Sequence, residues 1–197
     1  MTTPPPRVDG RTARSERTRN AIVDAHVSLI SDGDLRPTAD RIAKLAGVSL
    51  RALWSHFADM EALFSASAQR ILDQRDQSFT PIPAELPLAE RIERYCARRA
   101  RMNEAIGPAA RASALKEPFS PALQRFRRHH LERIRDEAAT LFAAEIGDDK
   151  VLLDAVVAVV SFNTWDTMRN PMELAVDDAR NTVRRAITAL LGSGRGA

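Results

Sequence analysis

The segment that most constrains the fold is residues 38–57, which reads TADRIAKLAGVSLRALWSHF. Apolar residues at helical spacing run up to Gly47 and resume after Ser49, which predicts two short helices joined by a tight turn. Thr38 and Ser49 stand where a hydroxyl can cap each helix, because it accepts a bond from an otherwise unpaired backbone N–H. A helix-turn-helix of this kind lays its second helix in the major groove of DNA. The segment therefore predicts a DNA-binding element.

The positive charge of the chain is concentrated around this segment. The 197 residues hold 29 Lys and Arg against 26 Asp and Glu, which gives a net charge of +3. Residues 1–57 contain nine basic and six acidic residues, so the remaining 20 basic and 20 acidic residues cancel. The whole excess thus lies where DNA phosphates would be bound. The alternative is a basic tail that is merely solvated.

The rest of the chain has helical periodicity almost throughout. Residues 1–14 lack it and are predicted to form a flexible basic arm, with the first helix starting near Ser15 and ending at Gly33. No segment alternates apolar and polar residues with β-branched enrichment, so we predict no sheet. We predict an all-α fold of about nine helices. Beyond the helix-turn-helix, the expected helices cover residues 59–79, 88–106, 108–116, 121–146, 149–169 and 177–191.

Catalytic and membrane functions are disfavoured by what the sequence lacks. Cys96, His129 and His130 form no metal-binding pattern, and the eight glycines form no phosphate-binding loop and no G-x-S-x-G motif. We therefore expect no enzyme activity, no cofactor and no metal. A single cysteine permits no internal disulfide, and residues 1–20 do not resemble a secretory signal. The apolar run 151–160 is too short to span a bilayer, so we expect a cytoplasmic protein without a membrane partner.

A string of residues at fixed spacing in the N-terminal third resembles the TetR family of transcriptional regulators. The resemblance covers roughly residues 15–72, and beyond them it extends only to a run of helices. It is carried by Gly33, Thr38, Ile42, Ala43, residues 46–49, Leu53, Trp54, His56, Phe57 and residues 61–63. It implies a homodimer that binds an inverted-repeat operator and releases it when a small molecule enters the C-terminal domain.

The resemblance also implies a division into four parts. Residues 1–14 would be the arm, 15–60 the DNA-binding domain, 61–80 a connecting helix, and 81–197 an effector-binding and dimerisation domain. Three places depart from the family pattern. Leu50-Arg51 follows the cap of the second helix, where the family often has Lys-Gly. Met60 stands where the family usually has a phosphate-binding Lys, and Trp54 replaces the usual Tyr while keeping one donor in its indole N–H.

The N-terminal end of a recognition helix faces base edges, so base contacts are expected there and phosphate contacts around it. Arg51 suits bidentate reading of guanine, although a solvated Arg is the alternative. Leu50 could meet only a thymine methyl, and His56 is nearly as compatible with packing at the helix end. The predicted base-reading residues are Ser49, Leu50, Arg51 and Ala52, and the predicted backbone contacts are Arg17, Thr38, Trp54, Ser55 and His56.

Two polar residues interrupt apolar helical stripes in the C-terminal region. Arg99 needs either a structural partner such as Asp154 or Asp166, an anionic ligand group, or a route for its head group to the surface. His130 is either a satisfied core histidine or a ligand contact. With their neighbours they give a candidate effector site, for which simple core packing is the alternative. Its residues are Tyr95, Arg99, Met102, Phe126, His130, Asn163 and Trp165.

The last two expected helices are candidates for pairing with a second copy of the chain. The segment 149–169 is apolar on nearly all sides, more than one intramolecular contact requires. The predicted dimer interface comprises Phe162, Val183, Ile187 and Leu190. Together these features predict a sequence-specific DNA-binding regulator, most simply a repressor released by a small-molecule effector. The alternative is an architectural DNA-binding dimer that senses no ligand.

Overall fold

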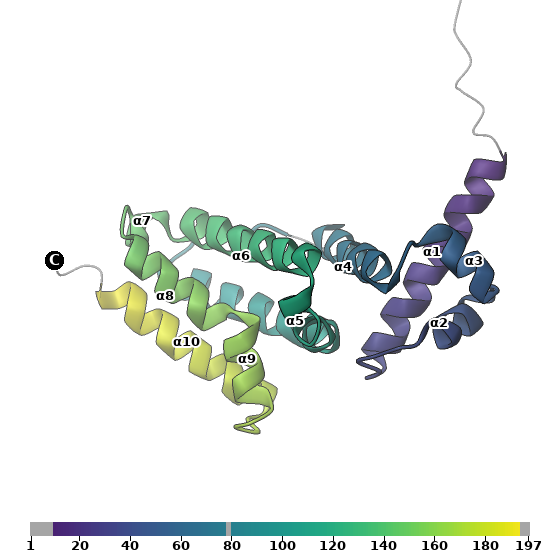
Figure 1. Cartoon of the computed structure of the whole chain (residues 1–197). Coiled ribbons are helices and arrows are strands. Elements are labelled where there is room, and N and C mark those ends of the chain that lie inside the picture. The colour runs from purple at the N-terminus through teal and green to yellow at the C-terminus, as the bar shows by residue number, and fades with distance from the viewer. Residues whose placement is uncertain (1–9, 78–79, 194–197) are drawn as a thin grey trace, which may run out of the picture.

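The computed structural model describes residues 10–77 and 80–193, and all regular structure among them is helical (Figure 1). Ten α-helices and one short 3-10 helix occur there, without a strand. The predicted all-α class is thus confirmed, with one helix more than expected. Within the described residues, no single helix is long and apolar enough to cross a membrane, and the bent pair Lys150–Val160 and Phe162–Arg169 reaches that length and composition only when the two helices are taken together.

The first three helices form a helix-turn-helix head around a small core of their own. They are α1 (Gly10–Ser31), α2 (Ala39–Ala46) and α3 (Leu50–His56), followed by α4 (Met60–Gln77). The core of the head joins apolar residues from all four helices: Ile22, Val23, Ala25, Ile42, Ala43, Leu53, Phe57 and Leu63. Apolar spacing therefore places α3 with one face on the core and the other in solvent.

The start of α1 differs from the prediction. The helix begins at Gly10, so residues 10–14, expected to belong to the arm, are helical, while residues 1–9 lie outside the described part. The first turns of α1 are mostly exposed and therefore carry no apolar stripe that could have revealed them. Arg and Ala, which dominate residues 11–14, favour helix by intrinsic propensity alone.

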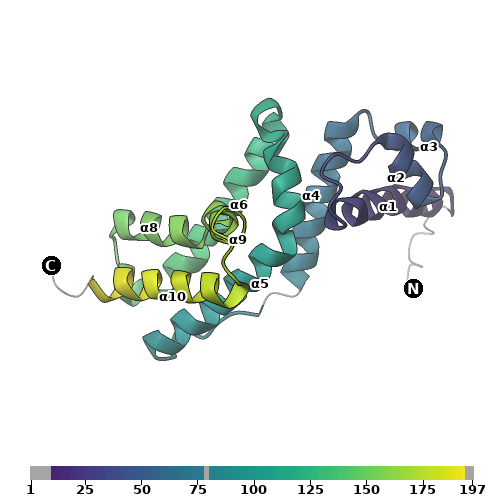
Figure 2. The same cartoon turned by 90° about the horizontal axis from the view of Figure 1, so that it is seen from below.

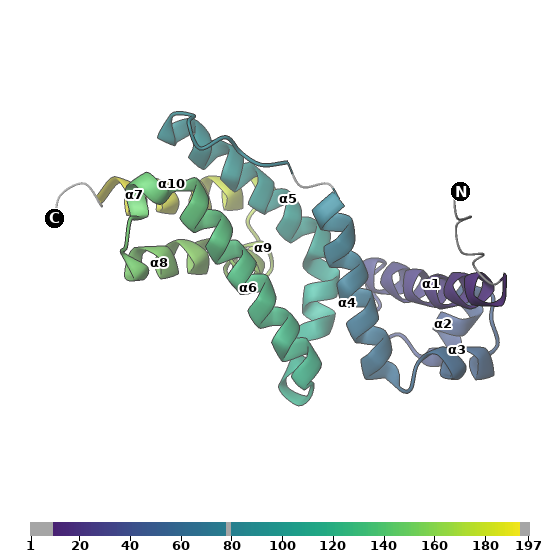
Figure 3. The same cartoon turned by 90° about the horizontal axis from the view of Figure 1, so that it is seen from above.

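Seven further elements form the C-terminal bundle. They are α5 (Leu88–Ala114), η1 (Glu117–Phe119), α6 (Pro121–Leu141), α7 (Ala143–Ile146), α8 (Lys150–Val160), α9 (Phe162–Arg169) and α10 (Val176–Ser193). Their main core is built by α5, α6, α8, α9 and α10. Figures 2 and 3 show α4 between the head and the bundle, and α4 contacts both α1 and α6.

Three helix boundaries in the bundle were predicted wrongly. α5 continues through Gly107 and Pro108 although a proline inside a helix removes one backbone hydrogen bond, and the packing of α5 on α1 and α9 offsets this loss. The expected helix 121–146 breaks at Phe142, whose buried ring packs edge-on against Tyr95 at a centroid distance of 5.4 Å. The expected helix 149–169 breaks at Ser161, whose extended backbone lets its hydroxyl cap α9 by accepting from the Thr164 N–H at 3.4 Å.

Candidate DNA interface and ligand cavity

The turn between α2 and α3 has the expected capping geometry. The Thr38 hydroxyl accepts from the Arg41 N–H at 3.4 Å, and the Ser49 hydroxyl accepts from the Ala52 N–H at 3.1 Å. Gly47 ends α2 with φ of 67°, a left-handed conformation that glycine adopts without the strain of a side chain. These three local signals fix where α3 begins and therefore which residues point outward.

The outer face of α3 carries most of the predicted DNA contacts. Leu53 is fully buried and Phe57 nearly so. Leu50, Arg51, Trp54 and Ser55 are exposed on the opposite side, while Ala52 and His56 are half-buried. Trp54 keeps 40% of its surface in solvent, an unusual exposure for so large an apolar ring. The exposed side chains of α3 are thus among those that the sequence predicts to contact DNA.

Hydroxyl groups around α3 are engaged locally but retain donor capacity. Thr38 and Ser49 use a lone pair to cap their helices, so each O–H can still donate to a phosphate oxygen. The Ser55 hydroxyl instead donates to the Ala52 carbonyl at 2.7 Å, so it would contact DNA as an acceptor or after rotating. Arg17 is exposed on α1. The contact roles of these residues remain predictions.

The departure at Met60 has a structural explanation. Met60 is half-buried and packs against the core of the head at the start of α4. It therefore contributes apolar contact rather than a charge at this position. Nearby, the Arg19 guanidinium lies 5.0 Å from the centre of the Phe57 ring, in the range of a cation–π contact.

A cavity of about 460 Å³ lies in the bundle and reaches the head. Its walls come from α4, α5, α6, α8 and α9, and Ile30 of α1 also lines it. Most lining residues are apolar, among them Phe64, Ile71, Leu72, Ile106, Leu123, Ile134 and Val157. A volume of this size with a mainly apolar lining is typical of a small-molecule site.

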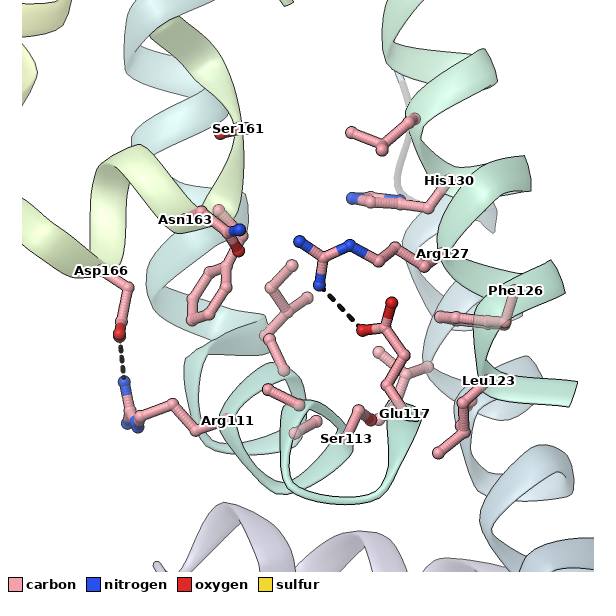
Figure 4. Close-up of a pocket in the computed structure, with 18 of the residues that line it drawn as sticks. Arg111, Ser113, Glu117, Leu123, Phe126, Arg127, His130, Ser161, Asn163 and Asp166 are labelled. Atoms are coloured by element: carbon pink, nitrogen blue, oxygen red, sulfur yellow. Dashed lines mark hydrogen bonds and ion pairs between the residues drawn. The ribbon is translucent and has the colours of Figure 1, made fainter. Parts of the chain in front are cut away.

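Two ion pairs lie at the wall of this cavity (Figure 4). The Arg127 Nη1 atom on α6 donates to Glu117 Oε2 on η1 at 2.9 Å. The Arg111 Nη1 atom on α5 donates to Asp166 Oδ1 on α9 at 3.1 Å. All four side chains are partly exposed, between 24% and 41%. The first pair joins the consecutive elements η1 and α6, and the second joins α5 to α9 across 55 residues of chain.

Three of the seven predicted effector residues line the cavity, namely Phe126, His130 and Asn163. Figure 4 shows His130 on α6 and Asn163 on α9 directed into the space from opposite sides. Phe162, predicted for the dimer interface, also lines the cavity. Met102 lies instead at a separate hollow of about 720 Å³ lined by residues of α1, α4 and α5.

The other three predicted effector residues belong to the bundle interior and do not line the cavity. Tyr95 is fully buried in the core, where burial raises the pKa of its hydroxyl. Trp165 is 3% exposed, and its indole N–H donates to Glu104 Oε1 at 2.7 Å. Arg169 donates to the same Glu104 oxygen at 2.9 Å, and this bond, with the Trp165 bond, keeps the Glu104 pKa below its usual value.

Arg99 has a different structural partner from those proposed. Its side chain is 2% exposed, so it does not reach the surface, and its Nη2 atom donates to the Val160 carbonyl at 3.2 Å. Asp154 pairs with Arg135 and Asp166 with Arg111. The apolar stripe correctly indicated that Arg99 faces the interior, but a backbone acceptor carries no sequence signal.

Two of the four predicted dimer residues, Val183 and Ile187, need correction, whereas Leu190 and Phe162 are only partly buried and their role in a dimer stays a prediction. Val183 and Ile187 are buried in the core of their own chain, at 4% and 0% exposure, and Leu190 packs against the same core. An apolar stripe on α10 cannot tell an intramolecular neighbour from a second copy, and here the neighbour is intramolecular. Beyond Val176 at its start, the exposed positions of α10 are polar or small, for example Arg185, Thr188 and Ala189.

Sequence reasoning missed the charged residues of the cavity wall. Arg111, Glu117 and Arg127 read as ordinary solvated residues, because their partners come from other helices. It also missed His26, which is fully buried between α1 and α4 and contacts the Ser67 hydroxyl through Nδ1 at 2.8 Å. The only available signal was its place one residue after Ala25 within the apolar stripe of α1.

Comparisons with known proteins agree with this architecture. No protein-family model matches the chain. Uncharacterised helix-turn-helix-type transcriptional regulators of Mycobacterium tuberculosis and Mycobacterium bovis are 36% identical over 75 residues, a segment that spans 38% of this chain and 38% of each relative. The match therefore covers well under half the length of these curated relatives.

Solved structures extend the similarity over both parts of the chain. A TetR-family transcriptional regulator from Streptomyces coelicolor superposes with a TM-score of 0.74 at 19% identity, covering 91% of this chain and 82% of that one. A transcriptional regulator from Rhodococcus gives a TM-score of 0.68 at 19% identity, covering 91% and 96%. The resemblance seen in the sequence is thus confirmed, and the chain has the fold of the TetR family of transcriptional regulators.

Proposed function

We propose that the chain is a sequence-specific DNA-binding transcriptional regulator that binds an inverted-repeat operator as a homodimer. The observation that carries the proposal is the outer face of α3, where Leu50, Arg51 and Trp54 are exposed from a helix capped by Ser49. A tryptophan is mostly buried in folded domains, so Trp54 at 40% exposure beside the exposed Leu50 is an apolar surface that a partner can cover. The excess basic charge of residues 1–57 supports DNA as this partner.

Release by a small-molecule effector, and hence a repressor role, is supported by where the cavity lies. Ile30 of α1 and Phe64, Ser67 and Ala68 of α4 line it, so a ligand would touch the helices that carry the head. A ligand that binds one arrangement of these helices better than another shifts the population toward it. In a dimer, a small rotation suffices, because the two heads must enter grooves about 34–36 Å apart.

The proposed dimer surface is the outer side of α8 and α10, which contact each other along the edge of the bundle (Figure 1). Val151 on α8 is 79% exposed. The exposed small residues Thr188 and Ala189 on α10 would let a second copy approach closely. Two helices from each chain would then form a four-helix interface.

The test is selection of bound sequences from a random pool of duplex DNA by the purified full chain. The expected result is one short inverted repeat whose half-sites are separated by about one helical turn. Recovery of unrelated sequences with strongly salt-dependent binding would replace the proposal with an architectural DNA binder. Recovery of no DNA would contradict both.

A further inference from the structure

We infer that the cavity takes an uncharged, largely apolar molecule with one hydrogen-bonding end, and that it discriminates against carboxylates. This inference rests on the proposed sensing function, because it names the chemical class of the effector. It follows from how the charged residues of the wall are arranged. Isolated arginines in an apolar cavity indicate an anionic ligand, whereas arginines with partners do not.

Every charged residue of the described lining has an opposite charge in hydrogen-bond or ion-pair contact. Arg127 pairs with Glu117 at 2.9 Å, and Arg111 pairs with Asp166 at 3.1 Å. The fifth charged residue, Asp154, pairs with Arg135 from outside the lining. The wall thus contributes two guanidinium groups against three carboxylates, so its own charge balance is slightly negative.

A carboxylate ligand would therefore meet an unfavourable site. To bond Arg127 it would have to displace Glu117, and to bond Arg111 it would have to displace Asp166. Either exchange would deprive the displaced Glu117 or Asp166 of its arginine partner and leave it close to the carboxylate of the ligand. The repulsion between the two negative charges raises the free energy of the complex. The anion would also lose its hydration shell on entering the apolar interior. An uncharged molecule avoids both losses.

The remaining lining defines the two ends of such a molecule. Phe64, Leu72 and Ile134 are buried apolar residues that can cover a hydrocarbon or aromatic body. Asn163 on α9 is directed into the space across from Arg127 (Figure 4). Its amide can both donate and accept, so it suits a hydroxyl, carbonyl or amide group. The cavity is therefore matched to an amphipathic but neutral ligand.

The first experiment compares three probes with one body and different ends: 4-phenylbutanamide, 4-phenylbutanoate and 4-phenylbutylamine. Each is titrated calorimetrically into the full chain at pH 7. The amide is expected to bind about tenfold more tightly than the carboxylate, which corresponds to about 1.4 kcal/mol. The ammonium probe is expected to bind more weakly than the amide, because the wall carboxylates already have partners.

A variant that removes one wall carboxylate tests whether the ion pairs are the reason for weak binding of a carboxylate ligand. Glu117→Gln keeps the shape of the side chain but removes its negative charge, so Arg127 gains capacity for an external carboxylate. The carboxylate probe is then expected to bind about tenfold more tightly than it does to the unaltered chain, with the amide nearly unchanged. Asp166→Asn makes the same change at Arg111, and it replaces Glu117→Gln if that variant does not fold.

Asp177→Asn is the matched control, because it neutralises an exposed carboxylate paired with Arg180 on α10, away from the cavity. It is expected to change none of the three affinities. The inference is overturned if the unaltered chain prefers the carboxylate or the ammonium probe, if no probe binds, or if both neutralising variants leave the preference unchanged. DNA selection is measured without probes. If the chain selects an inverted repeat but prefers the carboxylate probe, the inference about ligand class fails and the proposed DNA-binding function stands.

Discussion

The Nδ1 atom of His26 lies 2.8 Å from the hydroxyl oxygen of Ser67, and this contact joins α1 of the head to α4 inside the protein. The Ser67 hydroxyl also donates to the Leu63 carbonyl at 2.9 Å, so it must accept from the imidazole. The His26 ring packs edge-on against Phe64 at a centroid distance of 4.7 Å. Because Ser67 and Phe64 also line the cavity, one small cluster touches both the ligand space and the head.

His26 should make the stability of the chain dependent on pH. Burial, with a smaller contribution from the charge of Lys116, lowers the His26 pKa to about 4 from an ordinary value of about 6.5. Between these values the unfolded chain binds a proton that the folded chain does not, so stability rises with pH across this window and is complete above about 6.5.

The expected loss from this residue between pH 7 and pH 5 is about 2 kcal/mol. It is measured as the free energy of unfolding in urea at both pH values. Between pH 7 and pH 5, the free energy of unfolding of His26→Gln should fall by about 2 kcal/mol less than that of the unaltered chain. The variant His129→Gln, which changes an exposed histidine, should show the same pH dependence as the unaltered chain. Equal pH dependence in His26→Gln and the unaltered chain would rule out this role.

Arg51 is expected to read a base. Arg51→Ala should weaken binding to the selected operator by about 1–3 kcal/mol and relax the preference at one base pair. Arg17→Ala should instead weaken operator and random DNA alike, because a phosphate contact carries no sequence information. Fluorescence anisotropy on both duplexes at one fixed salt concentration distinguishes the two. Equal losses on both duplexes for Arg51→Ala would contradict base reading.

The cap of α3 should be measurable as stability of the head. Ser49→Ala removes the acceptor for the Ala52 N–H and should lower the free energy of unfolding by about 1 kcal/mol. Ser55→Ala, on the same helix, loses only a bond to a carbonyl inside the helix and should cost less. Urea unfolding checks both, and a larger loss for Ser55→Ala would mean that Ser49 is not the cap.

The pair between Arg91 and Glu145 should be the most sensitive ion pair of the bundle. The two side chains are 8% and 3% exposed, and two bonds of 2.7 and 2.9 Å join them. Glu145→Ala would leave Arg91 buried without its carboxylate and should cost about 3–5 kcal/mol. Glu90→Ala removes the partner of Arg94 in an exposed pair and should cost under about 1 kcal/mol. Similar losses for both variants, by urea unfolding, would contradict the role of burial.

The dimer surface can be tested by a single charge. Ala189→Arg on the outer side of α10 should shift a dimer toward monomers in sedimentation equilibrium, because it places a bulky cation in a close helix contact. Phe119→Arg is the control, since Phe119 is 86% exposed on η1, away from that surface. A monomeric unaltered chain would contradict the homodimer, and dimerisation that survives Ala189→Arg would place the interface elsewhere.

The parts of this fold that the sequence predicts are those whose signals are local. Thr38, Gly47 and Ser49 act on backbone within a few residues of themselves, so the helix-turn-helix could be predicted together with its caps. The break at Ser161 also has a local cap, but the apolar residues on both sides conceal it. Periodicity alone does not separate one helix from two in such a run.

The cavity was only partly predictable, because its walls form where helices that are distant in the sequence pack together. His130 and Phe126 share a helix face, and their spacing revealed it. Arg127 contacts Glu117 across a chain reversal, and Arg111 contacts Asp166 across 55 residues, so spacing gave no warning of either pair. Tyr95 on α5 and Trp165 on α9 are residue types that often contact ligands, but both lie in the core of the bundle.

The break between α8 and α9 determines how a guanidinium can lie in the interior at all. In one continuous helix the Val160 carbonyl would be occupied by a backbone N–H four residues later. Because α8 ends there, this carbonyl accepts from Arg99 at 3.2 Å and from Asn103 at 3.4 Å. The C-terminal end of a helix carries a partial negative charge of about half an electron. The end of α8 thus supplies part of the negative charge that balances Arg99. A continuous helix through Ser161 would remove this contribution, because the Val160 carbonyl would then bond to the backbone.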